Sequence, residues 1–258
     1  MSALRYAASD TLVLAKRSLL RIPRAPDLLL SFTVQPIMFV LLFVYVFGGA
    51  IETPGYDDYV DFLMPGIIVQ TMSFGGFVTA LGLAEDLKKG LIDRFRSLPM
   101  ARSAVLGGRT LADVATNLLS LGVMIGVGLL VGFSFSSPWY EVLAGIGLML
   151  LFGYAFSWIF AFLGLSASSA ESAQAIGFMA IFPLTFASSA FVPVDSMPDW
   201  LQAFANANPF TTMTDAMRAL WVDAPAGNDV LFAFLWSIGL IAVFAPISVA
   251  RYRRAVSA

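Results

Sequence analysis

The chain has 258 residues, of which 59 % are hydrophobic and only 12 % are charged, far from the averages of soluble domains. This composition predicts an integral membrane protein of one domain, because 258 residues hold about six helical spans of roughly 20 residues plus loops. The absence of Cys excludes disulfides and thiolate metal sites, and the absence of His removes the commonest general base and metal ligand.

The N-terminal stretch predicts an amphipathic interfacial helix. Over residues 4 to 22 apolar side chains fall on one helical face and basic side chains lie elsewhere around the axis. Pro23 and Pro26 end this helix and turn the chain into the bilayer. The apolar run 28 to 47 is too long for a signal-peptide core and lacks a small-residue cleavage site, so it is interpreted as a retained first span. We therefore divide the chain into an interfacial helix and turn, 1–27, and a six-span domain, 28–258.

Five further spans are predicted at about 60–84, 111–133, 139–165, 175–192 and 230–250. The second contains Pro65 and Gly75-Gly76, which are tolerated where neighbouring helices cover the freed backbone. The third contains the small-residue pairs Gly122/Gly126 and Gly128/Gly132, which permit close helix contact and are interpreted as packing.

The one densely charged segment, 85–110, lies between the second and third spans and carries six basic and three acidic residues. Residues at this density must lie in water. Apolar residues recur at helical spacing from Leu87 to Leu98, which predicts a short amphipathic helix that Pro99 ends. Such a helix suits the docking of a soluble partner, and an ordinary solvated loop is the alternative.

A second distinctive segment, 193–228, combines prolines and acids with apolar aromatic residues. It predicts two short amphipathic helices, separated at Asn208-Pro209, that lie in the interface or dip into it.

The basic residues predict the orientation of the chain in the membrane. If the chain crosses the membrane six times, 14 of the 15 basic residues lie on one side and only Arg218 lies on the other. The positive-inside rule then makes both termini and the charged segment cytoplasmic.

The chemistry of the spans excludes several classes of protein. Charged residues near the spans sit at their predicted ends, at Asp61, Asp113, Glu141 and Asp229, so the ionisable groups that proton- and ion-coupled transporters need at depth are absent. No Walker-type loop is present, and Gly164-Leu165-Ser166 has no His to activate its serine and marks a helix end. A membrane domain of this kind needs a soluble motor.

Three segments resemble the ATP-binding cassette type-2 permeases, the daunorubicin-resistance-like drug and lipid exporters. The charged segment, with Gly90 and the Leu98-Pro99-Met100-Ala101-Arg102 end, is similar to the family's cytoplasmic coupling segment. Residues 191–201 are similar to its segment after the fifth span. Asn208-Pro209 followed by Arg218 is similar to its outer helix, although the Thr212 position more often carries a larger polar residue in the family.

The resemblance implies a permease without a cofactor or catalytic site of its own, in a bacterial-type plasma membrane. It implies a second, identical permease subunit and two cytoplasmic ATPase subunits that bind ATP and Mg. The residues expected to contact the ATPase are Glu85, Lys89, Gly90, Arg94, Arg96, Pro99, Arg102 and, in the 166–174 turn, Glu171. For Glu171 a solvated turn residue is the alternative.

The resemblance also implies a substrate path between two permease subunits, bordered by the first, second and fifth spans. Phenylalanines at helical spacing on these spans are the candidates for its lining, with lipid-facing or core positions as the alternative: Phe39, Phe43, Phe74, Phe77, Phe178, Phe182 and Phe186. Four outer aromatic residues are expected to cap the exit or to act as passive anchors: Trp200, Phe204, Phe210 and Trp221.

An uncharged lining favours lipophilic or amphipathic drugs or lipids, moved outward, because a strongly polar substrate would find no partner at depth. Two other functions stay open. An importer permease of the same superfamily also uses a cytoplasmic loop, although the proline-rich outer helices argue against it. A stand-alone channel or membrane scaffold would need no ATPase.

Overall fold

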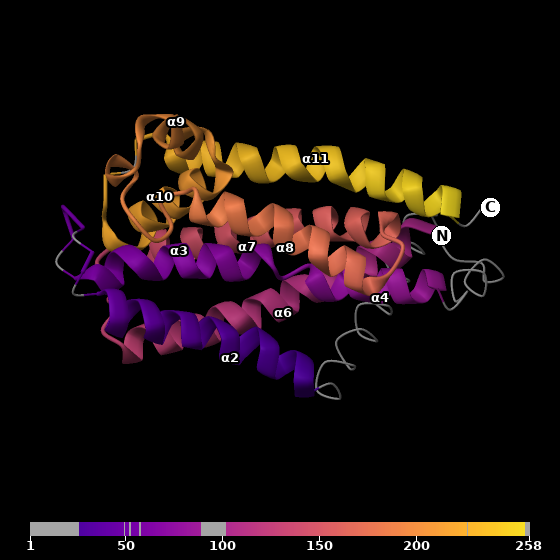
Figure 1. Cartoon of the computed structure of the whole chain (residues 1–258), viewed down its shortest axis with the longest axis horizontal. Coiled ribbons are helices and arrows are strands. Elements are labelled where there is room, and N and C mark those ends of the chain that lie inside the picture. The colour runs from indigo at the N-terminus through magenta and orange to yellow at the C-terminus, as the bar shows by residue number, and fades with distance from the viewer. Residues whose placement is uncertain are drawn as a thin grey trace.

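The computed structural model describes residues 26–255 apart from 49, 52, 57, 89–101 and 226, and these residues form helices and connections without strands. The long helices run lengthwise side by side, while α9 and α10 gather at the end opposite the chain's C-terminus (Figure 1). The elements are α2 (Pro26–Leu42), its π-helical continuation η2 (Phe43–Phe47), α3 (Tyr59–Ser73), α4 (Phe77–Lys88), α6 (Arg102–Leu130), α7 (Trp139–Ser166), α8 (Ala170–Phe186), η3 (Val194–Ser196), α9 (Asp199–Ala207), α10 (Pro209–Val222) and α11 (Asp229–Ala255).

Among the described residues, four helical stretches are long and apolar enough to cross a membrane: Tyr59–Asp86, Leu106–Leu130, Trp139–Ser166 and Asp229–Arg254. They correspond to the second, third, fourth and sixth predicted spans. The first and fifth predicted spans fall on shorter apolar helices, Val34–Phe47 and the 17-residue α8. The all-α class predicted for a membrane protein is confirmed. The predicted interfacial helix, 4–22, lies outside the described residues.

The second predicted span is interrupted at its middle. Residues 74–76 form a turn between α3 and α4, which the Gly75-Gly76 pair makes possible. A Cβ atom on Gly75 would lie 1.9 Å from the Asn117 amide oxygen of α6, and one on Gly76 would lie 2.5 Å from Cα of Ser157 on α7. The two glycines therefore let both neighbouring helices approach the break.

The charged segment is shorter than predicted from the sequence. Its ends belong to long helices, because α4 continues to Lys88 and α6 begins at Arg102, which leaves residues 89–101 between them. The two helix ends are joined by an ion pair between Asp86 and Arg109. This ion pair links α4 and α6 close to the charged segment.

The glycines predicted to pack on the third span differ in their surroundings. Gly128 approaches the Met64 side chain, with 2.7 Å between its added Cβ and the methionine Cε. A Cβ added to Gly122, Gly126 or Gly132 would meet nothing within 4 Å among the described residues. Within that part of the chain, these three glycines therefore make no close helix contact.

A close helix contact lies instead between α4 and α7. A Cβ on Gly164 would lie 2.5 Å from the Ala80 carbonyl oxygen and 2.7 Å from its Cα, and backbone atoms cannot move aside as a side chain can. This glycine, which the sequence suggested only as a helix end, fixes the approach of α4 to the central helix.

We therefore expect Gly164→Ala to lower the free energy of unfolding by about 1–3 kcal/mol, the usual effect of overpacking. Thermal unfolding of the purified protein measures it. Gly147→Ala is the matched control, because Gly147 lies on the same helix and has nothing within 4 Å of its added Cβ. Equal unfolding temperatures for the two variants would contradict the close crossing.

Candidate functional site

Phenylalanine side chains from the first, second and fifth predicted spans meet in one continuous row, the aromatic ladder. Along α8 the centroid of Phe182 lies 5.4 Å from that of Phe178 and 5.7 Å from that of Phe186. Phe178 contacts Phe74 at 5.1 Å and Phe77 at 5.9 Å, at the α3–α4 break. The ladder consists of Phe39, Phe43, Phe74, Phe77, Phe178, Phe182, Phe186 and Phe191.

The structure brings all seven predicted lining residues together through an eighth that the sequence reasoning missed. Phe191 stacks on Phe43 of η2 at 4.7 Å and lies 4.9 Å from Phe186 of α8. It follows the end of α8, so helical spacing gave no signal for it. Phe191 is buried, whereas Phe186 at the end of α8 is 47 % exposed. The ladder thus presents aromatic faces that can stack against a planar apolar molecule.

The four predicted outer aromatic residues do not form one group. Trp200 and Phe204 on α9 are 74 % and 46 % exposed. Phe210 and Trp221 on α10 are fully buried in the core, where Phe210 contacts Phe152 and Phe156 of α7. Trp221 donates through Nε1 to the Val142 carbonyl, at 3.3 Å. Only the α9 pair is therefore placed to meet a membrane or a ligand.

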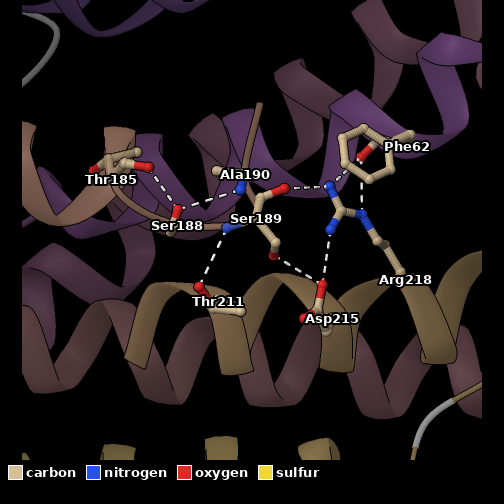
Figure 2. A network of polar contacts seen from close by, with 8 residues as sticks. All are labelled: Phe62, Thr185, Ser188, Ser189, Ala190, Thr211, Asp215 and Arg218. Carbon is tan, nitrogen blue, oxygen red and sulfur yellow. Dashed lines mark hydrogen bonds and ion pairs between the residues drawn. The ribbon is translucent and has the colours of Figure 1, made fainter. Parts of the chain in front are cut away.

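Helix α10 lies at the end of the bundle opposite the C-terminus (Figure 1), where a buried arginine holds it (Figure 2). Nε and Nη2 of Arg218 both donate to the Phe62 carbonyl of α3, at 3.0 and 2.9 Å, and Nη2 also donates to the Ser189 carbonyl at 2.7 Å. Nη1 donates to Asp215 at 2.7 Å, and the guanidinium lies 3.6 Å from the centroid of the Phe62 ring. Burial lowers the pKa of Arg218, and the Asp215 carboxylate opposes that effect.

Further polar contacts fasten the same helix to the connection after α8. Asn208 caps α10 by accepting from the Phe210 amide at 2.9 Å, and its own amide donates to the carbonyls of Leu184 and Ala187 at 2.6 and 2.8 Å. The Ser189 hydroxyl donates to Asp215 at 2.8 Å. We call the contacts of Arg218, Asp215, Ser189 and Asn208 the outer latch.

The residues predicted to contact the ATPase are only partly described. Glu85 is exposed near the end of α4, and Glu171 is exposed in the first turn of α8, which begins with a capping box between Ser169 and Ser172. Arg102 begins α6. The other five, Lys89, Gly90, Arg94, Arg96 and Pro99, lie outside the described residues.

Asp113, which the sequence places near the end of the third span, lies about two turns inside the candidate span Leu106–Leu130. It is only 6 % exposed, and its carboxyl group faces the hydroxyls of Thr79 and Ser157. An ionisable group is therefore buried between α4, α6 and α7.

The family model described as "ABC-2 type transporter" matches residues 9–221 of the chain. The chain belongs to the ABC-2 type transporter family. It is 35 % identical to the daunorubicin resistance ABC transporter permease protein DrrB1 of Streptomyces coeruleorubidus over 96 % of this chain and 87 % of the relative. It is 26 % identical to a probable doxorubicin resistance ABC transporter permease, DrrC, of Mycobacterium tuberculosis, over 98 % of this chain and 92 % of that protein.

A third relative is a probable multidrug ABC transporter permease, YbhR, of Escherichia coli, which is 25 % identical over 77 % of this chain and 54 % of the relative. The resemblance found in the sequence to daunorubicin-resistance-like permeases is thereby confirmed. The ABC-2 permease is a multi-pass membrane subunit of an ABC transporter, and ATP hydrolysis belongs to a separate ATPase subunit.

Proposed function

We propose that this permease moves lipophilic or amphipathic compounds, drugs or lipids, outward across the plasma membrane. The aromatic ladder is the observation that carries the proposal, because its side chains offer stacking surfaces and no charge to a substrate. The names of the relatives, which refer to daunorubicin, doxorubicin and multidrug resistance, support the same class of compound.

In the proposed assembly six spans, formed by α2–η2, α3–α4, α6, α7, α8 and α11, leave both termini in the cytoplasm. The distribution of basic residues supports this orientation. Two identical permease subunits meet with the ladder lining the path between them, and two ATPase subunits contact residues 85–102 and Glu171. Trp200 and Phe204 flank the outer exit, while Phe210 and Trp221 hold α10 in place.

The experiment is ATP hydrolysis by the permease reconstituted with its ATPase in liposomes. Daunorubicin-like planar compounds are expected to stimulate hydrolysis, and sugars or free ions are not. Phe182→Ala removes the central ring of the α8 row, which contacts Phe74, Phe178 and Phe186. We expect the half-stimulating concentration to rise about tenfold, corresponding to roughly 1.4 kcal/mol of lost stacking and burial.

Phe162→Ala is the matched control. Phe162 on α7 also makes an aromatic contact, with Phe244 of α11 at 5.9 Å, but it lies outside the ladder. Its removal should leave the stimulation curve unchanged. Stimulation by hydrophilic solutes alone, or equal effects of the two variants, would overturn the proposal.

A further inference from the structure

Four polar side chains from three helices converge beside the α3–α4 break. Asp113 and Asn117 lie four residues apart on α6, and therefore share one helical face. The Asp113 carboxyl group is faced by the hydroxyls of Thr79 on α4 and Ser157 on α7. All four side chains are buried. We call these four residues the buried polar cluster.

The Asp113 carboxyl group shares its counter-charge with another carboxylate. Among the described residues, Arg109, one turn before Asp113 on α6, acts on it electrostatically and is also paired with Asp86 at the end of α4. In the same part of the chain, the Oδ2 atom of Asp113 has no hydrogen-bond partner. A buried carboxylate without a full counter-charge is strongly unfavourable. The carboxyl group therefore has to be neutralised, either by a proton or by a bound cation.

The neighbouring groups can supply oxygen ligands for such a cation. The Ser157 hydroxyl lies within hydrogen-bond reach of both the Gly153 carbonyl, at 3.2 Å, and the Asp113 carboxyl group. When it donates to Gly153, its oxygen is available to a cation bound beside Asp113. The Nδ2 atom of Asn117 is buried without a partner among the described residues. Rotation of the Asn117 amide by half a turn would exchange its nitrogen and oxygen atoms and place the oxygen at the position now taken by Nδ2. A carboxylate, two hydroxyls and an amide are the oxygen ligands that hard cations prefer.

The location of the cluster suits a bound ion. Asn117 lies against Gly75 of the break, and also against Gly153 of α7, where an added Cβ would approach its amide nitrogen to 2.7 Å. The break at 74–76 falls near the middle of the candidate span Tyr59–Asp86. Broken helices at mid-depth expose backbone carbonyls, and in many transporters they coordinate a small cation.

We propose that the buried polar cluster binds one monovalent cation of the Na⁺ class through Asp113, Asn117, Thr79 and Ser157. One carboxylate neutralises one charge, whereas a divalent ion would leave a net charge inside the membrane. Among the described residues no group of three or more acidic side chains offers a divalent site. The bound ion would hold α6 and α7 against the break. Phe74, which belongs to the break, contacts Phe178 of the aromatic ladder.

The test measures thermal unfolding of the purified permease in NaCl and in choline chloride at equal ionic strength. The unfolding temperature is expected to rise with NaCl along a saturating curve, and isothermal calorimetry should give one site per chain. Asp113→Asn, an isosteric and neutral change, should abolish both responses. Thr79→Val keeps the charge but removes one oxygen ligand, and it should weaken Na⁺ binding about tenfold or more.

Glu141→Gln is the matched control, because it removes a carboxylate from the first turn of α7, the helix that carries Ser157, and should leave the Na⁺ response unchanged. If Asp113→Asn does not fold, Thr79→Val and Ser157→Ala decide the question. Equal stability in sodium and choline, or an unaltered response in these variants, would overturn the site. Stability that varies with pH but ignores sodium would assign the missing charge to a proton and would also overturn it.

Discussion

Arg218→Ala is expected to lower the free energy of unfolding by about 3 kcal/mol or more, the scale for breaking a buried ion pair. The variant leaves the carbonyls of Phe62 and Ser189 without their donor and Asp215 without its cation. Each buried acceptor left unsatisfied costs about 1–3 kcal/mol. Because the Asp215 side chain is 34 % exposed, water can solvate its carboxylate and so reduces the free-energy cost of removing its cation. Thermal unfolding of the purified permease measures the change.

Arg218→Lys separates the geometry of the latch from its charge. One ammonium group cannot reproduce the guanidinium fork that reaches α3, the connection after α8 and Asp215 together, so we expect most of the destabilisation to persist. Arg251→Ala is the control, since Arg251 is exposed on α11, and its effect should stay within about 0.5 kcal/mol. If all three variants unfold at the temperature of the parent, α10 does not depend on this latch.

The sequence predicted those features that depend on local chemistry. Hydrocarbon requires long apolar helices, so the positions of α3–α4, α6, α7 and α11 followed from the apolar runs. The separation of α9 from α10 followed from Asn208-Pro209, because Asn is a good cap and Pro is favoured in the first turn. The phenylalanine stripes were recognised from helical spacing, although their union through Phe191 was not.

The features that could not be predicted from the sequence depend on contacts between residues that are far apart in the chain. Arg218 was recognised as the single basic residue on the outer side, but its main acceptor, the Phe62 carbonyl, lies 156 positions away. The burial of Asp113 does not follow from the sequence, because it depends on the approach of α4 and α7 to α6, which brings Thr79 and Ser157 against the carboxyl group. Helical periodicity shows which residues share a face, and it does not show what that face contacts.

The route from the charged segment to the aromatic ladder is built from close helix contacts. Asp86 and Arg109 join the two helix ends that flank residues 89–101. From there α4 crosses α7 at Gly164 with backbone contact, which leaves little room for one helix to slide on the other. At its other end α4 begins with Phe77, which contacts Phe178 of the ladder. A displacement of the segment would therefore move the break and the ladder together.

The triple variant Glu85→Ala, Arg94→Ala, Arg96→Ala is accordingly expected to uncouple transport. Glu85 is exposed one turn before the end of α4, and removal of three charges weakens docking to the ATPase. We expect transport in proteoliposomes to fall at least tenfold, which roughly 1.4 kcal/mol of lost interaction would produce. Membrane insertion and the unfolding temperature should be unchanged, because Glu85 is exposed and Arg94 and Arg96 belong to the densely charged segment of the sequence.

The control removes three charges from the C-terminal end of α11, which lies at the same end of the helix bundle as the end of α4 (Figure 1), by Arg251→Ala, Arg253→Ala and Arg254→Ala. These positions are exposed and lie outside the charged segment, so a general loss of surface charge would affect both triple variants equally. Coupling through the segment predicts a selective loss in the first, with ATPase subunits that still hydrolyse ATP but no longer respond to lipophilic compounds. Transport at the parent's rate by an assembled first variant would refute the coupling role of these residues, while the response of Phe182→Ala would still test the ladder independently.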